Sequence, residues 1–211
     1  MTPAADSRYP IAVLVSGSGT NLQAILDAAA DPGYAATVAV VISDRPGVRA
    51  LGRADAAGVP TAVVAWGDHP DRESFSTAVC DAAAAHGAEA IVMAGFMRIL
   101  SAAALNRYSG RILNIHPSLL PAFAGTTHAV RDALGHGVKL TGVTVHLADE
   151  HVDYGPILEQ EAVPVLAGDT EDTLHARIQD VEHRLYPAAI DAFARGRYEV
   201  AGRVVARREP V

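Results

Sequence analysis

Residues 11–26 read Ile11-Ala-Val-Leu-Val-Ser-Gly-Ser-Gly-Thr-Asn-Leu-Gln-Ala-Ile-Leu26, an apolar run followed by a glycine turn and a helix-forming segment. The run is continuously apolar rather than alternating, which is typical of a strand covered on both faces. Glycines at 17 and 19 allow a tight turn into the helix. This stretch predicts the first strand, turn and helix of an α/β protein.

The same alternation of short apolar runs and alanine-rich stretches continues along the chain. The predicted strands are Ile11–Val15, Thr37–Ile42, Thr61–Ala65, Ala90–Ala94 and Ile112–Ile115. The helix-forming stretches between them are Asn21–Ala30, Val48–Ala57, Arg72–Ala85 and Ser101–Tyr108. Repeated strand–helix–strand units at this spacing predict a Rossmann-like, open, mostly parallel sheet with helices on both faces. Leu140–Leu147 and Ile157–Val165 follow closely and predict an antiparallel addition after the fifth strand.

The carboxyl-terminal part of the chain predicts one long helix and a loose end. The helix extends from about Glu171 to Arg195 behind an Asp169-Thr170 cap, and Pro187 is expected to kink or interrupt it. With no repeat or linker, we expect a single domain over residues 1–211, with residues 1–9 and 204–211 as loose ends.

Composition narrows the class of protein. Half of the 211 residues are hydrophobic, which is ample for a buried core. The 17 Lys and Arg against 24 Asp and Glu give a net charge of −7, which argues against binding nucleic acid. No apolar stretch reaches the roughly 20 residues of a membrane span, and Cys80 is the only cysteine. We therefore expect a cytoplasmic protein without membrane or nucleic-acid partners; monomer and homodimer both stay open.

The glycine turn predicts an anion site, because the N–H groups that open a helix hold phosphate. The dinucleotide fingerprint GxGxxG is incomplete, since Leu22 occupies its third glycine position. Asp44, after the second strand, imitates the ribose-binding acid of dinucleotide enzymes, so a dinucleotide-dependent oxidoreductase is an alternative. A single monophosphate fits the turn better than a dinucleotide does. The simplest alternative is a tight strand-to-helix turn that binds no ligand.

Polar residues gather after the fifth strand. Asn114 and His116 flank Ile115, so strand alternation places both side chains on one face. An asparagine amide can donate to a developing oxyanion, and histidine can carry a proton. Asp153 is the acid expected to raise the pKa of His116, with Asp149 and Glu150 as competitors on the same loop.

Two further side chains and a metal alternative belong to the same region. Thr144 and His146 share one face of the following strand and are candidate supporting residues. A metal held by His116, His146 and Asp153 is a lesser alternative, because HExxH-type spacing is absent; no metal is expected.

These motifs together resemble the folate-dependent phosphoribosylglycinamide formyltransferases. The resemblance covers roughly residues 10 to 195, in order and at family-like spacing. It is carried by the stretches SGSGTNLQAI (16–25), AGFMRIL (94–100), LNIHPSLLP (113–121), GVTVH (142–146), DYGPI (153–157) and Glu182-His183.

The resemblance implies transfer of a formyl group from 10-formyltetrahydrofolate to the amine of glycinamide ribonucleotide in purine biosynthesis. It implies a catalytic trio of Asn114, His116 and Asp153, a substrate-phosphate site at Gly19, Thr20 and Asn21, and a ribose contact at Glu182. The residues that it places beside the folate are Met97, Arg98, Ile99, Leu100, Ala148, Asp149, Glu150, His151 and Val152.

Three points bear on how far the resemblance extends. The loop Ala122–His128, expected to move over the folate, departs from the common pattern. A formyltetrahydrofolate hydrolase would share the core, but such enzymes normally carry an added amino-terminal domain. A tRNA formyltransferase would be expected to carry an added tRNA-binding domain. Only about ten residues precede the first strand here, and the net charge of −7 disfavours tRNA.

Overall fold

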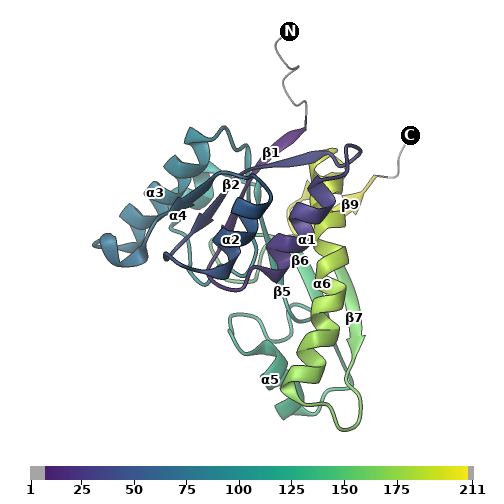
Figure 1. The fold of residues 1–211 in the computed structure, drawn as a ribbon. Helices are drawn as coiled ribbons and strands as arrows, with labels where there is room; N and C mark the ends of the chain where they lie inside the picture. The colour runs from purple at the N-terminus through teal and green to yellow at the C-terminus, as the bar shows by residue number, and fades with distance from the viewer. Residues whose placement is uncertain (1–7, 209–211) are drawn as a thin grey trace.

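The computed structural model describes residues 8–208 and has at its centre a mostly parallel sheet covered on both faces (Figure 1). Its strands are β1 (Tyr9–Val15), β2 (Ala36–Ser43), β3 (Thr61–Val63), β4 (Ala90–Met93), β5 (Ile112–His116), β6 (Leu140–Leu147) and β7 (Ile157–Pro164). Their order across the sheet is β3-β2-β1-β4-β5-β6-β7. The first five strands are parallel, β6 is antiparallel to β5, and β7 is antiparallel to β6. The predicted α/β sheet and its antiparallel addition are confirmed.

Helices cover the sheet in two layers, each closing its own apolar core. The helical segments are α1 (Thr20–Ala29), α2 (Arg49–Ala56), η1 (Trp66–Asp68), α3 (Arg72–Ala85), α4 (Ala102–Arg107), α5 (Ala129–His136) and α6 (Glu171–Ala194). Residues of α1, α2 and α6 pack on the face that presents Val13 and Val15 of β1. Residues of α3 and α4 pack on the opposite face, with Ala12 and Leu14. Figure 1 shows these two groups of helices on opposite sides of the strands.

Helix α6 runs unbroken through Pro187, so the predicted interruption is wrong. Proline removes one backbone hydrogen bond from a helix. Here the surrounding turns are held by tertiary contacts, because Tyr186 and Ile190 are fully buried and the Tyr34 hydroxyl donates to the Pro187 carbonyl at 2.9 Å. Burial on both sides of the proline keeps the helix continuous. Its predicted cap is present, since the Thr170 side chain accepts from the Thr173 N–H.

Both predicted loose ends are partly wrong. Tyr9 already belongs to β1, and residues 204–207 form β9 (Val204–Arg207), paired with β8 (Tyr198–Ala201) in an antiparallel hairpin. The turn is Gly202-Arg203, and Gly202 supplies a φ of 60°. β-Branched residues on both sides of this glycine were the signal for a hairpin. Residues 1–7 and 209–211 lie outside the described part of the chain.

The remaining difference lies between β5 and β6, where the sequence predicts no helix and the structure contains α5. Elsewhere the predicted helices match to within a residue or two. Within residues 8–208, no helix is long and apolar enough to cross a membrane.

Candidate active site

The glycine turn after β1 leads directly into α1 and leaves the first N–H groups of that helix available to a ligand. Gly19 has φ 72°, and a Cβ on it would lie 2.7 Å from the Cβ of Ala50, so only glycine fits. The Arg53 guanidinium donates from Nε to the Ser18 carbonyl and from Nη1 to Gln23 Oε1, each at 2.9 Å. Because the first N–H groups of a helix have no partner within the helix, this turn can receive an anion.

A buried carboxyl group from α6 lies beside this turn. Asn21 Nδ2 donates to Glu182 Oε2 at 3.0 Å, and Glu182 is only 6% exposed. Burial raises the pKa of Glu182, and the hydrogen bond from Asn21 only partly opposes the shift. Among the described residues, Asn21 Oδ1 and His183 Nε2 are buried polar atoms without a hydrogen-bond partner. Buried polar atoms without a partner are rare in folded proteins, and a bound ligand would supply the missing partner of Asn21 Oδ1.

The predicted catalytic trio comes together at the carboxyl end of β5, and His146 joins it. His116 Nδ1 lies 3.3 Å from Asp153 Oδ2, and Asn114 Nδ2 lies 3.5 Å from Asp153 Oδ1. His146 Nε2 lies 3.1 Å from Asn114 Nδ2 and 3.7 Å from Asp153 Oδ1. All four side chains are buried or partly buried, so the cluster is largely shielded from water.

The contacts of His146 define which way the Asn114 amide points. His146 Nδ1 lies 3.0 Å from the Leu147 carbonyl oxygen, which requires a proton on Nδ1. Nε2 then accepts one hydrogen of Asn114 Nδ2. The second hydrogen makes only the long contact with Asp153, so it is available to an oxygen of a bound substrate.

Both ring nitrogens of His116 face oxygen acceptors. Nε2 lies 2.9 Å from the Phe123 carbonyl, and Nδ1 faces the Asp153 carboxylate. Only the imidazolium form donates to both. Burial lowers the pKa of His116 overall; Asp153 raises it, as expected, but only partly offsets the effect of burial. Desolvation of a nearly buried ring outweighs one carboxylate.

Asp153 is the acid that reaches His116, as predicted. Its φ is 56°, and Oδ2 accepts from the Gly125 N–H at 2.9 Å. Burial alone would raise the pKa of Asp153, but contacts with His146 and the Gly125 N–H lower it overall. The competitor Asp149 instead accepts from the His151 N–H at 2.8 Å, and Glu150 is exposed.

Thr144 is the partner of His116 in the register of β5 and β6, and its side chain shapes the loop after β5. Its hydroxyl donates to the Ser118 carbonyl at 2.7 Å and accepts from the Leu120 N–H at 3.1 Å. Ser118 in turn donates to the Ala122 carbonyl, which leads into Phe123. Of the two candidate supporting residues, His146 therefore touches the trio and Thr144 orients the loop that covers it.

The predicted folate segment presents apolar side chains beside an anchored arginine. Met97 and Ile99 are 58% and 54% exposed, which is unusual for side chains this large, whereas Leu100 is buried. Arg98 Nε lies 2.8 Å from Asp44 Oδ2, and its guanidinium lies 4.9 Å from the Trp66 ring centroid. Val152, on the second predicted folate segment 148–152, is also 48% exposed.

Asp44 is already engaged, which removes the feature that suggested a dinucleotide. Its side chain is fully buried and contacts Arg98 and Arg45. Burial alone would raise the pKa of Asp44, but bonds from Ser16, Arg98 and Arg45 lower it overall. A carboxylate held by two guanidinium groups is not free to accept from a ribose.

The loop 122–128 closes over His116. Phe123 has φ 57°, in the left-handed region, and its carbonyl oxygen lies 2.9 Å from His116 Nε2. His128 lies at the start of α5, with its N–H on the Thr126 hydroxyl at 3.0 Å. Sequence reasoning missed the roles of Gly125 and Phe123, because neither is near His116 or Asp153 in any local pattern.

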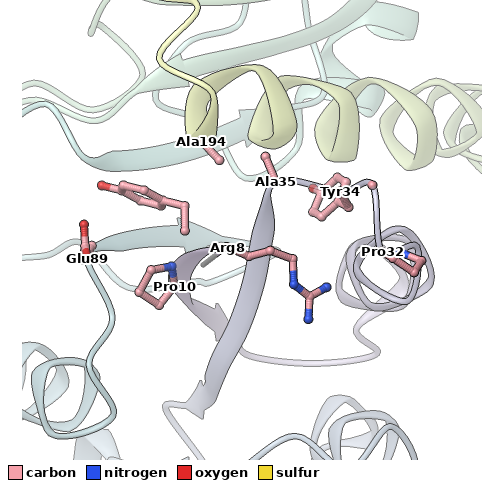
Figure 2. A pocket seen from close by; sticks show the side chains of 9 residues that line it. Arg8, Pro10, Pro32, Tyr34, Ala35, Glu89 and Ala194 are labelled. Atoms are coloured by element: carbon pink, nitrogen blue, oxygen red, sulfur yellow. The ribbon is translucent and has the colours of Figure 1, made fainter. Parts of the chain in front are cut away.

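Two surface cavities lie away from this cluster. One, of about 360 Å³, is lined by Arg8, Tyr34, Glu89 and their neighbours, at the amino ends of β1 and β2 (Figure 2). The other, of about 480 Å³, lies between α1, α2 and β2.

Within residues 8–208, no group of three or more His, Cys, Asp and Glu is arranged to hold a metal ion. Cys80 is buried in the core, and burial raises the pKa of its thiol to about 11.

Comparisons with known proteins agree on one group of enzymes. The model of the formyl transferase family matches residues 9–190. The chain is 50% identical to a phosphoribosylglycinamide formyltransferase of Mycobacterium tuberculosis, over 95% of this chain and 91% of that protein. It is 44% identical to a trifunctional purine biosynthetic protein of Gallus gallus, covering 94% of this chain and 20% of that protein. The structure of glycinamide ribonucleotide transformylase 1 from Symbiobacterium toebii superposes with a TM-score of 0.94, at 46% identity, over 99% and 98% of the two chains.

Proposed function

Because the chain belongs to the formyl transferase family, and within it to the phosphoribosylglycinamide formyltransferases, we infer that the cluster around His116 is its active site. The enzyme transfers a formyl group to the amine of glycinamide ribonucleotide, a step of purine biosynthesis. The formyl donor is a formyl-folate, and we propose 10-formyltetrahydrofolate. The observation that carries the site assignment is the convergence of Asn114, His116 and Asp153 at the carboxyl end of β5.

The substrate's phosphate and ribose are assigned to the turn after β1. Gly19, Thr20 and Asn21 would hold the phosphate with their N–H groups at the start of α1. Glu182 would accept from the ribose hydroxyls, and its burial strengthens such a bond. The unpartnered Asn21 Oδ1 supports this assignment, because a ligand hydroxyl would satisfy it.

The folate is assigned to the opposite side of the catalytic cluster. Met97 and Ile99 offer apolar surface from one segment, and Val152 offers it from the other. The remaining proposed contacts are Arg98, Leu100, Ala148, Asp149, Glu150 and His151. Exposed apolar side chains on these two loops suit a flat ring system that is polar at its edges.

The chemistry requires charge stabilisation and one proton acceptor. The substrate amine attacks the formyl carbon, and the carbonyl oxygen becomes an alkoxide in the tetrahedral intermediate. The free hydrogen of Asn114 Nδ2 and the protonated His116 would stabilise that oxygen. Asp153 would accept the proton that the amine loses, through a water molecule. Collapse of the intermediate breaks the bond to the folate nitrogen, which takes up a proton as the formylated amide leaves.

His116 can act as a cation here in spite of the burial that lowers its pKa. The Asp153 carboxylate and the Phe123 carbonyl both favour the cation, and a developing alkoxide adds a further negative charge. Direct attack by the amine needs no protein nucleophile, which suits a site without a Ser–His or Cys–His pair. The site thus supplies electrostatic stabilisation and positioning.

An absorbance assay of formyl transfer tests the function. The purified chain is mixed with 10-formyltetrahydrofolate, with and without glycinamide ribonucleotide, and tetrahydrofolate formation is followed. Turnover that depends on the ribonucleotide is the expected result. Equal turnover without the ribonucleotide, with release of formate, would instead identify a hydrolase. The cytoplasmic location, the absence of nucleic-acid and membrane partners and the choice between monomer and homodimer stay predictions.

A further inference from the structure

The carboxyl-terminal hairpin of β8 and β9 reaches the loop that carries Asp153. Arg203, in the two-residue turn of this hairpin, donates from Nη1 to the carbonyl oxygen of Tyr154. Its guanidinium carbon also lies 3.9 Å from the centroid of the Tyr154 ring. A cation over an aromatic face is attracted to it, so one side chain grips both the backbone and the ring of Tyr154.

Tyr154 is the residue next to Asp153, and its N–H donates to the His151 carbonyl at 3.3 Å. Its side chain is 52% exposed, so the core does not fix the ring. Its ring also lies near the His151 ring, at a centroid distance of 5.8 Å. Asp153 itself adopts φ 56°, a left-handed conformation that costs free energy for a residue other than glycine. Surrounding contacts must therefore maintain the conformation that aims its carboxylate at His116.

The hairpin is anchored well enough to act as a support. The Tyr198 hydroxyl and Arg207 Nη1 both contact Glu159 Oε1 on β7, at 2.8 and 2.6 Å. The Arg208 N–H donates to the Arg197 carbonyl at 2.8 Å and closes the base of the hairpin. The turn with Arg203 is thereby held over the loop from the edge of the main sheet.

We propose that Arg203 is a positioning residue for the transfer reaction: by holding Tyr154 it keeps the Asp153 carboxylate against His116. The proposal rests on the proposed function, in which Asp153 and His116 act together. Arg203 touches neither substrate in this account, and its effect passes through the Tyr154 peptide. The hairpin is anchored on β7 at the edge of the sheet, whereas the glycine turn follows β1, so we expect the effect on the catalytic step rather than on phosphate binding.

Kinetics of Arg203→Ala, beside Arg208→Ala, test the proposal. Arg208 lies on the same hairpin and pairs with Glu199 at 2.8 Å, so its removal changes the same charge without touching the loop. We expect Arg203→Ala to lower kcat about tenfold, because displacement of a catalytic group by a fraction of an ångström has effects of that order. The KM for the ribonucleotide is expected to stay within about twofold, and Arg208→Ala to match the wild type. Arg203→Lys keeps the cation and a donor and should recover part of the loss.

A second readout separates positioning from mere stability and does not depend on turnover. The His116 ring protons are titrated by NMR in the wild type and in both variants. Release of Asp153 should lower the pKa of His116 in Arg203→Ala and leave it unchanged in Arg208→Ala. An unchanged His116 titration together with a normal kcat in Arg203→Ala would overturn the proposal, even if the melting temperature fell. If the wild type fails to transfer formyl groups, the proposed function fails, while the NMR comparison still decides whether Arg203 holds the loop.

Discussion

His116 and Asp153 meet at 3.3 Å between Nδ1 and Oδ2, although one ends a parallel strand and the other lies on the loop between two antiparallel strands. The contact joins the two parts of the sheet at the point where strand direction reverses. Open α/β sheets bind their ligands outside the carboxyl ends of the parallel strands, and His116 is the last residue of one of them. The antiparallel addition thus supplies the acid that the parallel part lacks.

Removal of the His116 ring tests its catalytic role. We expect His116→Ala to lower kcat by a factor of about 10² to 10⁴, the usual effect of losing a proton-carrying or charge-stabilising group. Binding of the ribonucleotide, measured by calorimetry, should change little, because the phosphate turn lies on α1. His86→Ala serves as the control, since His86 is exposed at the end of α3. A kcat within a few-fold of the wild type would exclude His116 from the chemistry.

Titration of His116 by NMR tests its coupling to Asp153. Burial places the pKa of His116 below the ordinary value of 6.5, and the Asp153 charge counters part of that decrease. Asp153→Asn removes the countering charge, so the pKa of His116 should fall further. His146 also lies beside the ring and lowers the pKa of His116, and it is unchanged in this variant. A pKa that is unchanged or higher in Asp153→Asn would contradict the coupling.

A pair of glycine substitutions tests the phosphate turn. Gly19→Ala adds a Cβ 2.7 Å from Ala50 at a φ of 72°, and we expect it to cost about 1–3 kcal/mol of stability. It should also raise the KM for the ribonucleotide more than the KM for the folate. Gly17→Ala, where a Cβ meets nothing within 4 Å, is the matched control and should be near neutral. Denaturant titration and steady-state kinetics measure both effects; equal KM increases for both substrates would argue against the assignment.

Arg53 is expected to hold the same turn from outside. Arg53→Gln removes the bonds to the Ser18 carbonyl and Gln23, and with them a positive charge near the bound phosphate. We expect the KM for the ribonucleotide to rise about tenfold, in line with the loss of about 1.4 kcal/mol, with kcat little changed. Arg49→Gln removes an exposed arginine from the same helix and is the control. If the two variants raised the KM by similar amounts, Arg53 would act only through its positive charge and not by holding the turn.

We predict that the ionised Glu182 side chain lowers the stability of the fold and contributes to binding of the ribonucleotide. Because burial raises its pKa above 4.5, the folded protein is disfavoured by its ionisation, and stability is lost as pH rises from 4.5 through the folded pKa. Glu182→Gln should therefore melt a few degrees higher than the wild type at pH 7.5, and the difference should vanish near pH 4. Affinity for the ribonucleotide should fall in the same variant. A lower melting temperature at pH 7.5 would show that the charge stabilises the fold.

Local patterns were sufficient for most elements of the fold. The unbroken apolar run Ile11–Val15 with its glycine turn, and the similar runs after it, identify strands buried on both faces. The cap and composition of α6 were enough to locate it in the sequence. Its continuity through Pro187 could not be predicted, because it depends on the contact with Tyr34 and on burial by other elements. The β8–β9 hairpin was missed because its exposed strands carry a weak hydrophobic pattern.

Local sequence patterns were enough to predict the chemistry of the candidate site: a glycine turn before a helix, and Asn114 and His116 two positions apart on one strand face. Those features are local, since backbone geometry alone relates residues so close in the chain. Only the tertiary structure decided which of three loop acids reaches His116, that His146 completes the cluster, and that Arg203 reaches Tyr154. It also decided that the pKa of His116 is lowered, because desolvation depends on every element packed around the ring.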